Sequence, residues 1–230
     1  MKVPIILQAR VGSTRLPGKV LMEILGKPML YYIIERLKLA KNSMVILAIP
    51  DTEEDSKLCK IAKQLDVDCV KGSELDVLGR YYRVSKLYPS HFYIRATADN
   101  PLVDFESAER LINFMLTHNF DYAVEKGMPR GGAVEIFTDK ALELSYKLSV
   151  EDRHREHVTL FMKEEPRLFK CAYPSVPKEL NHPELSITVD RKDEFEFAKR
   201  IYEKFYKEGK PFKLVKIIDK IVEEAKLGKR

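Results

Sequence analysis

The sequence predicts an α/β fold with a mainly parallel, twisted sheet flanked by helices. Short apolar runs of strand length alternate along the chain with amphipathic stretches of helix length. Strands that alternate with helices at this spacing form βαβ units, whose strands run parallel. Hydrophobic residues make up 45% of the 230 residues, and no repeat or low-complexity segment breaks the alternation. The chain is therefore long and apolar enough to bury a sizeable core.

In the first half of the chain, the apolar runs predict strands at residues 3–7, 44–49, 67–70 and 91–96. Helices are predicted between them, where apolar residues return every three or four positions, at residues 28–39, 54–65 and 75–87. Pro28 opens the first of these helices, and one of its faces carries Met29, Tyr32, Ile33 and Leu37. Each helix is long enough to cross back to the start of the next parallel strand.

The second half continues the same alternation. Asp104 is placed to cap a helix that runs to about His118. Further helices are expected at residues 140–148, 154–163 and 193–207, with a last one at the end of the chain. Strands are expected near Tyr122, at residues 134–137 and at residues 185–189. One domain over residues 1–230, with a small projecting element at residues 121–137, accounts for the whole pattern.

Composition and charge exclude several classes of protein. The net charge is only +5, from 40 basic and 35 acidic residues, and no basic block marks a nucleic-acid-binding face. The first apolar run is too short for a secretory signal, and none reaches the roughly 20 residues that span a bilayer. We therefore expect a soluble, cytoplasmic protein. Three cysteines without a CxxC pair predict free, buried thiols rather than a zinc site or a disulfide framework: Cys59, Cys69 and Cys171.

The most informative segment is the loop after the first strand, Gln8-Ala-Arg-Val-Gly-Ser-Thr-Arg-Leu-Pro-Gly-Lys19. Gly12 and Gly18 permit close backbone approach, and Arg10, Arg15 and Lys19 supply three cations. Ligands bind at the carboxyl ends of parallel strands. The glycines and cations of this loop are therefore better explained as a polyphosphate-binding site than as a basic loop that only faces solvent. A Walker A loop and the dinucleotide fingerprint GxGxxG are both absent.

Two aspartates are candidate metal ligands. Asp99 and Asp190 each follow a predicted strand, so both carboxylates should emerge at the ligand-binding edge of the sheet. With triphosphate oxygens and water, two carboxylates make the octahedral oxygen site that Mg²⁺ prefers. Helix capping is the alternative role for such residues, but it suits Asp104 and Asp193 better, since each lies at a predicted helix start.

Two other patterns carry less weight. The Asp-Val-Asp at residues 66–68 has the DxD form of many glycosyltransferase metal sites, but it begins a strand and so lies at the wrong edge of a parallel sheet. Arginines and histidines gather at residues 153–157. There, Arg155 and His157 either grip a carboxylated sugar or form a solvated helix end, and both interpretations stay open.

The loop sequence resembles the opening motif of the sugar cytidylyltransferases, which include the 3-deoxy-manno-octulosonate and acylneuraminate cytidylyltransferases. It is most similar to the spore coat polysaccharide biosynthesis (SpsF-like) branch. Further matching motifs follow in family order over almost the whole chain: Gly72-Ser-Glu-Leu-Asp-Val-Leu78, Arg80-Tyr-Tyr82, Arg95-Ala-Thr-Ala-Asp-Asn-Pro101, Glu135-Ile-Phe137, Arg155-Glu-His-Val-Thr159 and Thr188-Val-Asp190. The resemblance implies a GT-A-like nucleotide-diphosphosugar transferase fold, a homodimer with its dimerisation element near residues 121–137, CTP as substrate and Mg²⁺ as cofactor.

The resemblance also implies roles for individual residues. Those that would hold the nucleotide are Ala9, Arg10, Gly12, Ser13, Arg15, Lys19, Gly72, Ser73 and Arg80. Those that would contact the sugar are Arg95, Glu135, Arg155 and His157. Catalysis would rest on Lys19, Arg10, Asp99 and Asp190, of which the two aspartates hold the metal. The chain departs from its branch at residues 97–101 and 129–132, where Thr-Ala-Asp-Asn-Pro and Pro-Arg-Gly-Gly stand in place of Thr-Gly-Asp-Cys-Pro and Pro-Asp-Gly. Residues 129–132 would border the sugar.

The expected reaction is attack by a sugar or sugar-acid hydroxyl on the α-phosphorus of CTP, giving a CMP-sugar and pyrophosphate for surface polysaccharide biosynthesis. One alternative is a GT-A-type glycosyltransferase that uses a nucleotide-sugar donor, and another is a non-catalytic nucleotide-binding protein. The cations of residues 10–19 suit a triphosphate better than a diphosphate donor. Lys19, Asp99 and Asp190 argue against a protein that has lost turnover.

Overall fold

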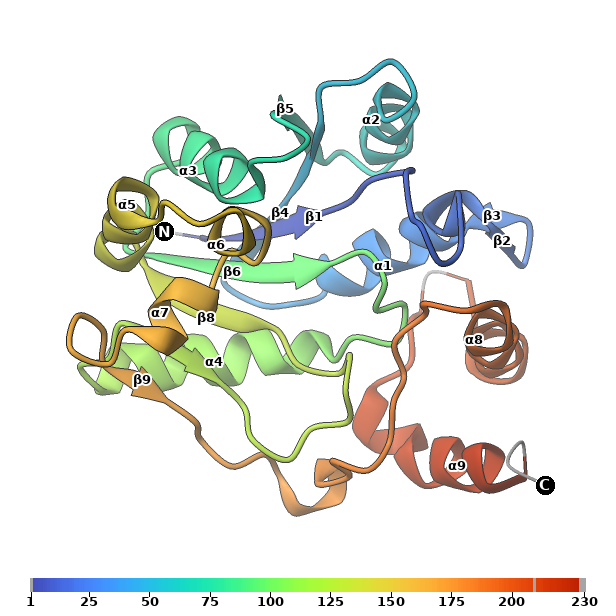
Figure 1. Ribbon diagram of the computed structural model, residues 1–230. Coiled ribbons are helices and arrows are strands. Elements are labelled where there is room, and N and C mark those ends of the chain that lie inside the picture. The colour runs from blue at the N-terminus through green and yellow to red at the C-terminus, as the bar shows by residue number, and fades with distance from the viewer. Residues whose placement is uncertain (1, 209, 228–230) are drawn as a thin grey trace.

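The computed structural model of the protein describes residues 2–208 and 210–227. Among these residues, seven strands form one sheet in the order β5-β4-β1-β6-β8-β7-β9 (Figure 1). They are β1 (Val3–Gln8), β4 (Ser43–Pro50), β5 (Asp68–Gly72), β6 (Phe92–Thr97), β7 (Tyr122–Val124), β8 (Glu135–Thr138) and β9 (Cys171–Ala172). β8 pairs antiparallel with both of its neighbours, and the other pairs are parallel. The prediction of a mainly parallel sheet is confirmed.

Helices connect the strands and cover both faces of the sheet. Within the described residues they are α1 (Met29–Leu37), α2 (Ser56–Gln64), α3 (Val77–Leu87), α4 (Phe105–Thr117), α5 (Asp139–Leu148), α6 (Asp152–Glu156), α7 (Leu160–Glu164), α8 (Lys192–Phe205) and α9 (Leu214–Leu227). Side-chain caps start several of them. Asp104 caps α4 as predicted by accepting a hydrogen bond from the backbone N–H of Glu106, and Thr138 caps α5 through that of Ala141.

Short elements complete the described chain. A two-stranded antiparallel hairpin, β2 (Glu23–Ile24) with β3 (Lys27–Pro28), precedes α1, and two 3₁₀ turns are η1 (Lys19–Leu21) and η2 (Lys178–Leu180). Within residues 2–208 and 210–227, no helix combines the length and the apolar character that a bilayer crossing requires.

Two apolar cores lie on the opposite faces of the sheet. Successive residues of β1 point to opposite faces, so Ile5 and Leu7 join one core and Ile6 joins the other. The first core packs against α1, α2, α4, α8 and α9, and the second packs against α3, α5 and α7. β1 is buried on both faces, which explains why it forms a continuous apolar run rather than an alternating one.

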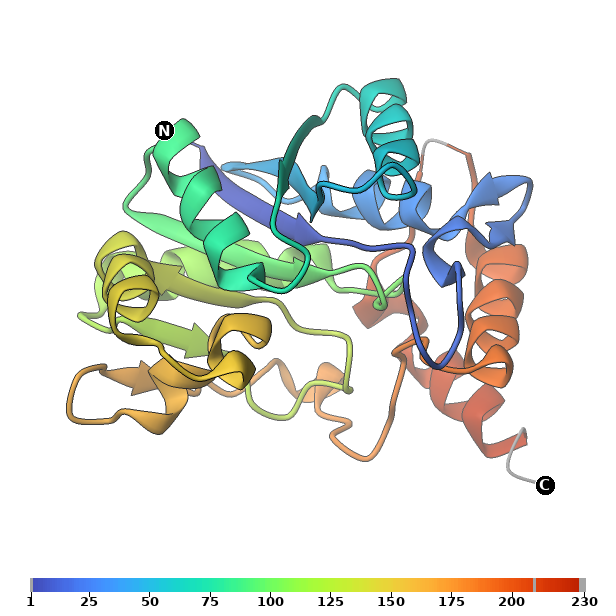
Figure 2. The same cartoon turned by 45° about the horizontal axis from the view of Figure 1, so that its top comes forward.

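The strand order reverses direction at β1. The chain passes from β1 to β4 and β5 on one side, then returns to β6 on the other side of β1. Such a switch leaves a crevice outside the carboxyl ends of the two central strands, because their connecting loops diverge there. Figures 1 and 2 show the blue loop after β1 descending at this edge, beside the orange segment that enters α8. The crevice is thus bordered by segments that are far apart in the sequence.

Two predicted elements take a different form in the structure. The single helix expected at residues 154–163 is two short helices, α6 and α7, separated at residues 157–159. The strand expected at residues 185–189 is an extended segment with one isolated bridge, from Ser186 to Arg130. Its backbone pairs with loops instead of a strand, since Ile187 N–H donates to Arg130 O at 2.9 Å and Val189 N–H donates to Asp99 O at 2.7 Å. An apolar run alone does not distinguish these two kinds of partner.

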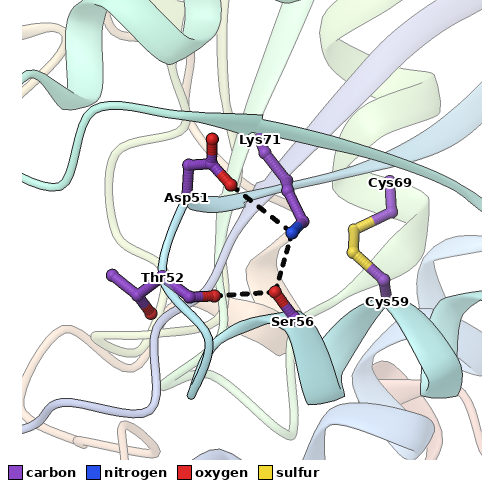
Figure 3. The surroundings of a disulfide bond; sticks show 6 residues. All are labelled: Asp51, Thr52, Ser56, Cys59, Cys69 and Lys71. Carbon is purple, nitrogen blue, oxygen red and sulfur yellow. Dashed lines mark hydrogen bonds and ion pairs between the residues drawn. A yellow bond between two sulfur atoms is a disulfide. The ribbon is translucent and has the colours of Figure 1, made fainter.

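The cysteine prediction is wrong for two of the three residues. Cys59 on α2 and Cys69 on β5 form a disulfide, with their Cα atoms 5.5 Å apart (Figure 3). The two positions meet because α2 packs back against the neighbouring strand β5, which their spacing of ten residues does not reveal. Cys171 on β9 is a free thiol, and burial raises its pKa.

Candidate active site

A cavity of about 570 Å³ lies at the carboxyl ends of β1 and β6, where the strand order reverses. The loop after β1 and the loop after β6 form two of its walls, and α3 contributes Val77 and Arg80. Arg130, the Glu156–His157 pair and the segment that enters α8 close the remaining sides. Lining side chains are mostly polar or charged, so the cavity suits a highly charged ligand.

The loop after β1 delivers its lysine into the cavity through a tight turn. Gly18 adopts a left-handed conformation with φ of 69°, which favours glycine, and the turn η1 begins at the next residue. Lys19 is 9% exposed. Its ammonium donates to the Val189 carbonyl at 2.7 Å and to Asp190 Oδ1 at 2.9 Å. The lysine is therefore fixed beside one of the two predicted metal ligands.

Asp190 carries two ion pairs. Its Oδ1 accepts from Lys19 Nζ, and its Oδ2 accepts from Arg15 Nη1, each at 2.9 Å. Partial burial alone would raise the pKa of this carboxyl, but the hydrogen bond and charge of Lys19, with the charges of Arg15 and Arg130, lower it below the ordinary value. Asp190 is consequently an anion at neutral pH.

Asp99 is brought to the same cavity by backbone pairing. Ala98 N–H donates to Gln8 O at 3.0 Å, which ties the loop after β6 to the end of β1. The Asp99 carbonyl accepts from Val189 N–H at 2.7 Å, immediately before Asp190. The side chain of Asp99 accepts from the Thr97 hydroxyl. Two aspartates that are 91 positions apart therefore line one cavity.

This pair of carboxylates fits a hard divalent cation. Both side chains are partly exposed to the cavity and offer the oxygen ligands that Mg²⁺ prefers. Within the described residues, no group of three or more His, Cys, Asp or Glu side chains is arranged to hold a metal ion. Any ion held by Asp99 and Asp190 would need further oxygen ligands from substrate or water.

Arg80, on α3, also lines the cavity. It is 3% exposed, and burial lowers the pKa of its guanidinium. Its Nη1 donates to the carbonyls of Ser73, at 2.5 Å, and Glu74, at 3.2 Å. Gly72 packs directly against it, since a Cβ there would lie 2.8 Å from Arg80 Cγ. Gly72 and Ser73 thus shape the wall by holding Arg80.

The chain matches the cytidylyltransferase family over residues 4–226. This chain belongs to the cytidylyltransferase family. It is 36% identical to an uncharacterised protein of Methanocaldococcus jannaschii, over 89% of this chain and 85% of that protein. It is 31% identical to the spore coat polysaccharide biosynthesis protein SpsF of Bacillus subtilis, over 86% of this chain and 85% of that protein. A solved structure of a cytidylyltransferase from Leptospira borgpetersenii superposes with a TM-score of 0.89 at 29% identity, covering 98% of this chain and 96% of the other.

Membership of the cytidylyltransferase family makes this protein a nucleotidyltransferase, and it confirms the resemblance seen in the sequence. The fold agrees as well, because the Leptospira cytidylyltransferase shares it over nearly the whole chain. The predicted α/β, GT-A-like architecture is thus confirmed.

In this cytidylyltransferase-family chain, most predicted site residues meet in the cavity. Its lining includes Ala9, Arg10, Ser13, Arg15, Lys19, Arg80, Arg95, Asp99, His157 and Asp190. Five others do not line it, although they lie in the described part of the chain: Gly12, Gly72, Ser73, Glu135 and Arg155. The contact roles predicted for these five stay predictions.

Glu135 lies directly behind a cavity residue. Its carboxylate pairs with Arg95 Nη1 at 2.5 Å and with Lys163 Nζ at 2.8 Å. It also accepts from the hydroxyls of Tyr122 and Thr159. Burial alone would raise the pKa of Glu135, but Arg95 and Lys163 lower it to about 2. Glu135 therefore orients the arginine that faces the cavity.

The structure places Arg155 and His157, whose roles the sequence left open, in different surroundings. His157 lines the cavity, whereas Arg155 stacks over the Tyr146 ring at 4.9 Å and lies 3.6 Å from Asp76 Oδ2. His154 is buried and hydrogen-bonds to a glutamate of α7, at 2.8 Å. The geometry favours His157 over Arg155 as the residue that reaches a ligand.

The resemblance placed residues 129–132 beside the sugar as a segment, without assigning a contact to any one of them, and two of them line the cavity. Arg130 reaches the cavity from the loop before β8, with its backbone paired to the extended segment at residues 185–187. Gly131, with φ of 91°, packs so tightly against Thr188 and Asn100 that a Cβ would lie within 2.7 Å of each. The Gly-Gly pair after Arg130 was the available signal, because it permits such an approach. Glu156 also lines the cavity; it lies within the matching motif at residues 155–159, but no contact was assigned to it from the sequence.

Proposed function

We propose that this protein is a Mg²⁺-dependent sugar cytidylyltransferase that joins CMP from CTP to a sugar or sugar acid and releases pyrophosphate. The observation that carries the proposal is the cavity at the strand switch, where the cations of the β1 loop face two carboxylates that suit a metal. A nucleoside triphosphate needs both features, since its charge must be neutralised before its phosphorus can be attacked.

In the proposed reaction, a hydroxyl oxygen of the acceptor attacks the α-phosphorus of CTP in line. The new bond joins that oxygen to phosphorus, the bond from the α-phosphorus to the bridging oxygen breaks, and pyrophosphate leaves with its electron pair. The hydroxyl proton passes to solvent. Lys19 and Arg15 leave Asp190 to neutralise the triphosphate, and Arg10 adds a third cation from the same loop.

Asp99 and Asp190 would hold the metal. A bound Mg²⁺ supplies positive charge that stabilises the departing pyrophosphate. Arg80 faces the cavity from the wall built on residues 72–74, so we assign it to the nucleotide. Arg95, Arg130 and His157 lie on the remaining walls, and we assign them to the acceptor.

The proposal also covers the use of the product and the assembly of the protein. The name of the Bacillus relative supports surface polysaccharide biosynthesis as the purpose of the product. A homodimer follows from the family resemblance alone. Residues 121–137, where a dimerisation element was expected, contribute β7 and the start of β8 to the main sheet. The glycosyltransferase alternative disagrees with membership of the cytidylyltransferase family, and a glycosyltransferase would release no pyrophosphate.

The test is pyrophosphate release by the purified protein, with and without Mg²⁺, from each of the four nucleoside triphosphates and a panel of acidic and neutral sugars. We expect release with CTP and one acceptor, and a fall of about 100-fold or more in Asp99→Asn. Asp66→Asn is the matched control, because Asp66 is an exposed aspartate of the rejected Asp-Val-Asp motif. Absence of CTP binding by the unaltered protein would refute the proposal.

A further inference from the structure

The cationic loop after β1 has a closed base. Gly18 N–H donates to the Val11 carbonyl at 3.1 Å, so residues 11–18 form a loop whose two ends are joined. The N–H of Val11 then donates to Asp55 Oδ1 at 2.6 Å. This second bond links the base of the loop to the start of α2, a segment 44 residues away in the chain.

Asp55 is buried and uses its carboxylate outside its own helix. Only 5% of the residue is exposed, and its Oδ2 accepts from the Thr52 hydroxyl at 2.7 Å. Thr52 in turn accepts from the Asp55 N–H, so the spacing from Thr52 to Asp55 is that of a capping box. In an ordinary capping box the acid returns to the cap residue's backbone N–H. Here one of its oxygens bonds to Val11 of another segment instead.

Asp55 also acts on a second wall of the cavity. Burial lowers the pKa of the Arg80 guanidinium, and the nearby Asp55 carboxylate opposes that drop. Asp51, four residues earlier, donates its backbone N–H to the Gly72 carbonyl at 2.8 Å, which ties the same turn to the end of β5. Figure 3 shows this turn beside the disulfide that fastens α2 to β5. The turn that carries the Asp55 carboxylate is thus held in place by β5 and by the disulfide.

We propose that Asp55 is a positioning residue for nucleotide binding: it fixes the base of the 11–18 loop, and thereby places the loop's backbone and its cations against the triphosphate. The inference rests on the proposed function, since it concerns the loop assigned to CTP. Asp55 touches no substrate in this account. It acts through Val11 and, by its charge, through Arg80.

The experiment measures the Kd of Mg²⁺-CTP by calorimetry for the full chain and for three variants. Asp55→Ala removes the acceptor and should weaken CTP binding about tenfold, the size of a lost hydrogen bond to a charged acceptor. Asp55→Asn keeps an oxygen for Val11 and should recover most of the affinity. Asp51→Ala is the matched control, because it removes a carboxylate from the same turn that pairs with Lys71 at 3.4 Å. It should bind CTP as the unaltered protein does.

A general loss of structure would give a different pattern. A partly unfolded variant has a lower apparent kcat, but its folded fraction keeps the same Kd. We therefore expect the KM for CTP to rise in Asp55→Ala while the KM for the acceptor stays unchanged. If Asp55→Ala does not fold, Asp55→Ser gives the same comparison, because its shorter side chain stays near Thr52 but withdraws the acceptor from Val11.

The outcomes separate this inference from the proposed function. An unaltered protein that binds CTP, with Asp55→Ala binding it equally well, overturns the positioning role alone. Asp51→Ala and Asp55→Ala weakening CTP binding to the same extent would also overturn it. An unaltered protein that binds no CTP refutes the proposed function, and the positioning role with it.

Discussion

At the residue scale, Lys19 and Asp190 constrain each other. Lys19 is nearly buried and divides its donors between the Val189 carbonyl and Asp190, so its ammonium is already held at the cavity wall before it turns from Asp190 to a phosphate. We predict that Lys19→Met lowers kcat/KM for CTP about 100-fold, the usual cost of one donor to developing charge. Steady-state pyrophosphate release measures the effect.

The control for Lys19→Met is Lys41→Met. Lys41 has a side chain that is 76% exposed and pairs with Glu109 on the surface, so its loss should leave the rate unchanged. Lys19→Met with an unaltered rate would mean that Lys19 serves only as the structural partner of Asp190.

At the scale of elements, the disulfide fastens α2 to β5. Closing a loop of ten residues restricts the unfolded chain, and a loop of this size contributes about 2–3 kcal/mol to the free energy of unfolding. We predict that the double variant Cys59→Ser/Cys69→Ser loses about that amount, as measured by urea unfolding. Iodoacetamide labelling of the unreduced, denatured protein should modify one thiol, Cys171. Cys171→Ser is the matched control, and labelling of all three cysteines would contradict the disulfide.

Elements with local causes were predictable from the sequence, and elements with distant partners were not. The apolar run of β4 and the Asp104 cap of α4 each predict the boundaries of their element to within about one residue. By contrast, residues 185–189 are as apolar as a strand but pair with loops. The disulfide depends in the same way on how α2 packs against β5, which spacing along the chain does not encode.

At the scale of the whole molecule, the site is assembled from segments that the sheet brings together. The β1 loop could be identified from the sequence because its glycines and cations are contiguous, and the rule for parallel strand ends gave its location. Asp55 could not, because it contributes through one contact with a segment far along the chain. In this fold, segments that are far apart in the sequence are therefore brought together by backbone pairing between loops as well as by the sheet.

The stability of the whole molecule should depend on the buried cluster around Glu135. Folding lowers the pKa of Glu135 from 4.5 to about 2. As the pH falls, Glu135 is therefore protonated in the unfolded chain before it is protonated in the folded protein. The stability that it contributes, roughly 3 kcal/mol, is complete above about pH 4.5 and is lost as the pH approaches 2. Urea unfolding between pH 7 and pH 3 measures this loss of stability. About 2 kcal/mol of the Glu135 contribution should be lost at pH 3.

The variant Glu135→Gln isolates this contribution from that of other carboxyl groups. It cannot titrate and leaves Arg95 without its buried partner, so at pH 7 it should be less stable than the unaltered protein. On acidification the difference between the two should narrow, because only the unaltered protein loses the Glu135 contribution. Other carboxylates, including Asp190 with its lowered pKa, titrate in both proteins and cancel in the comparison. Parallel losses of stability in the two proteins down to pH 3 would show that Glu135 titrates normally, and that Arg95 is held in the cavity wall by something other than this charge.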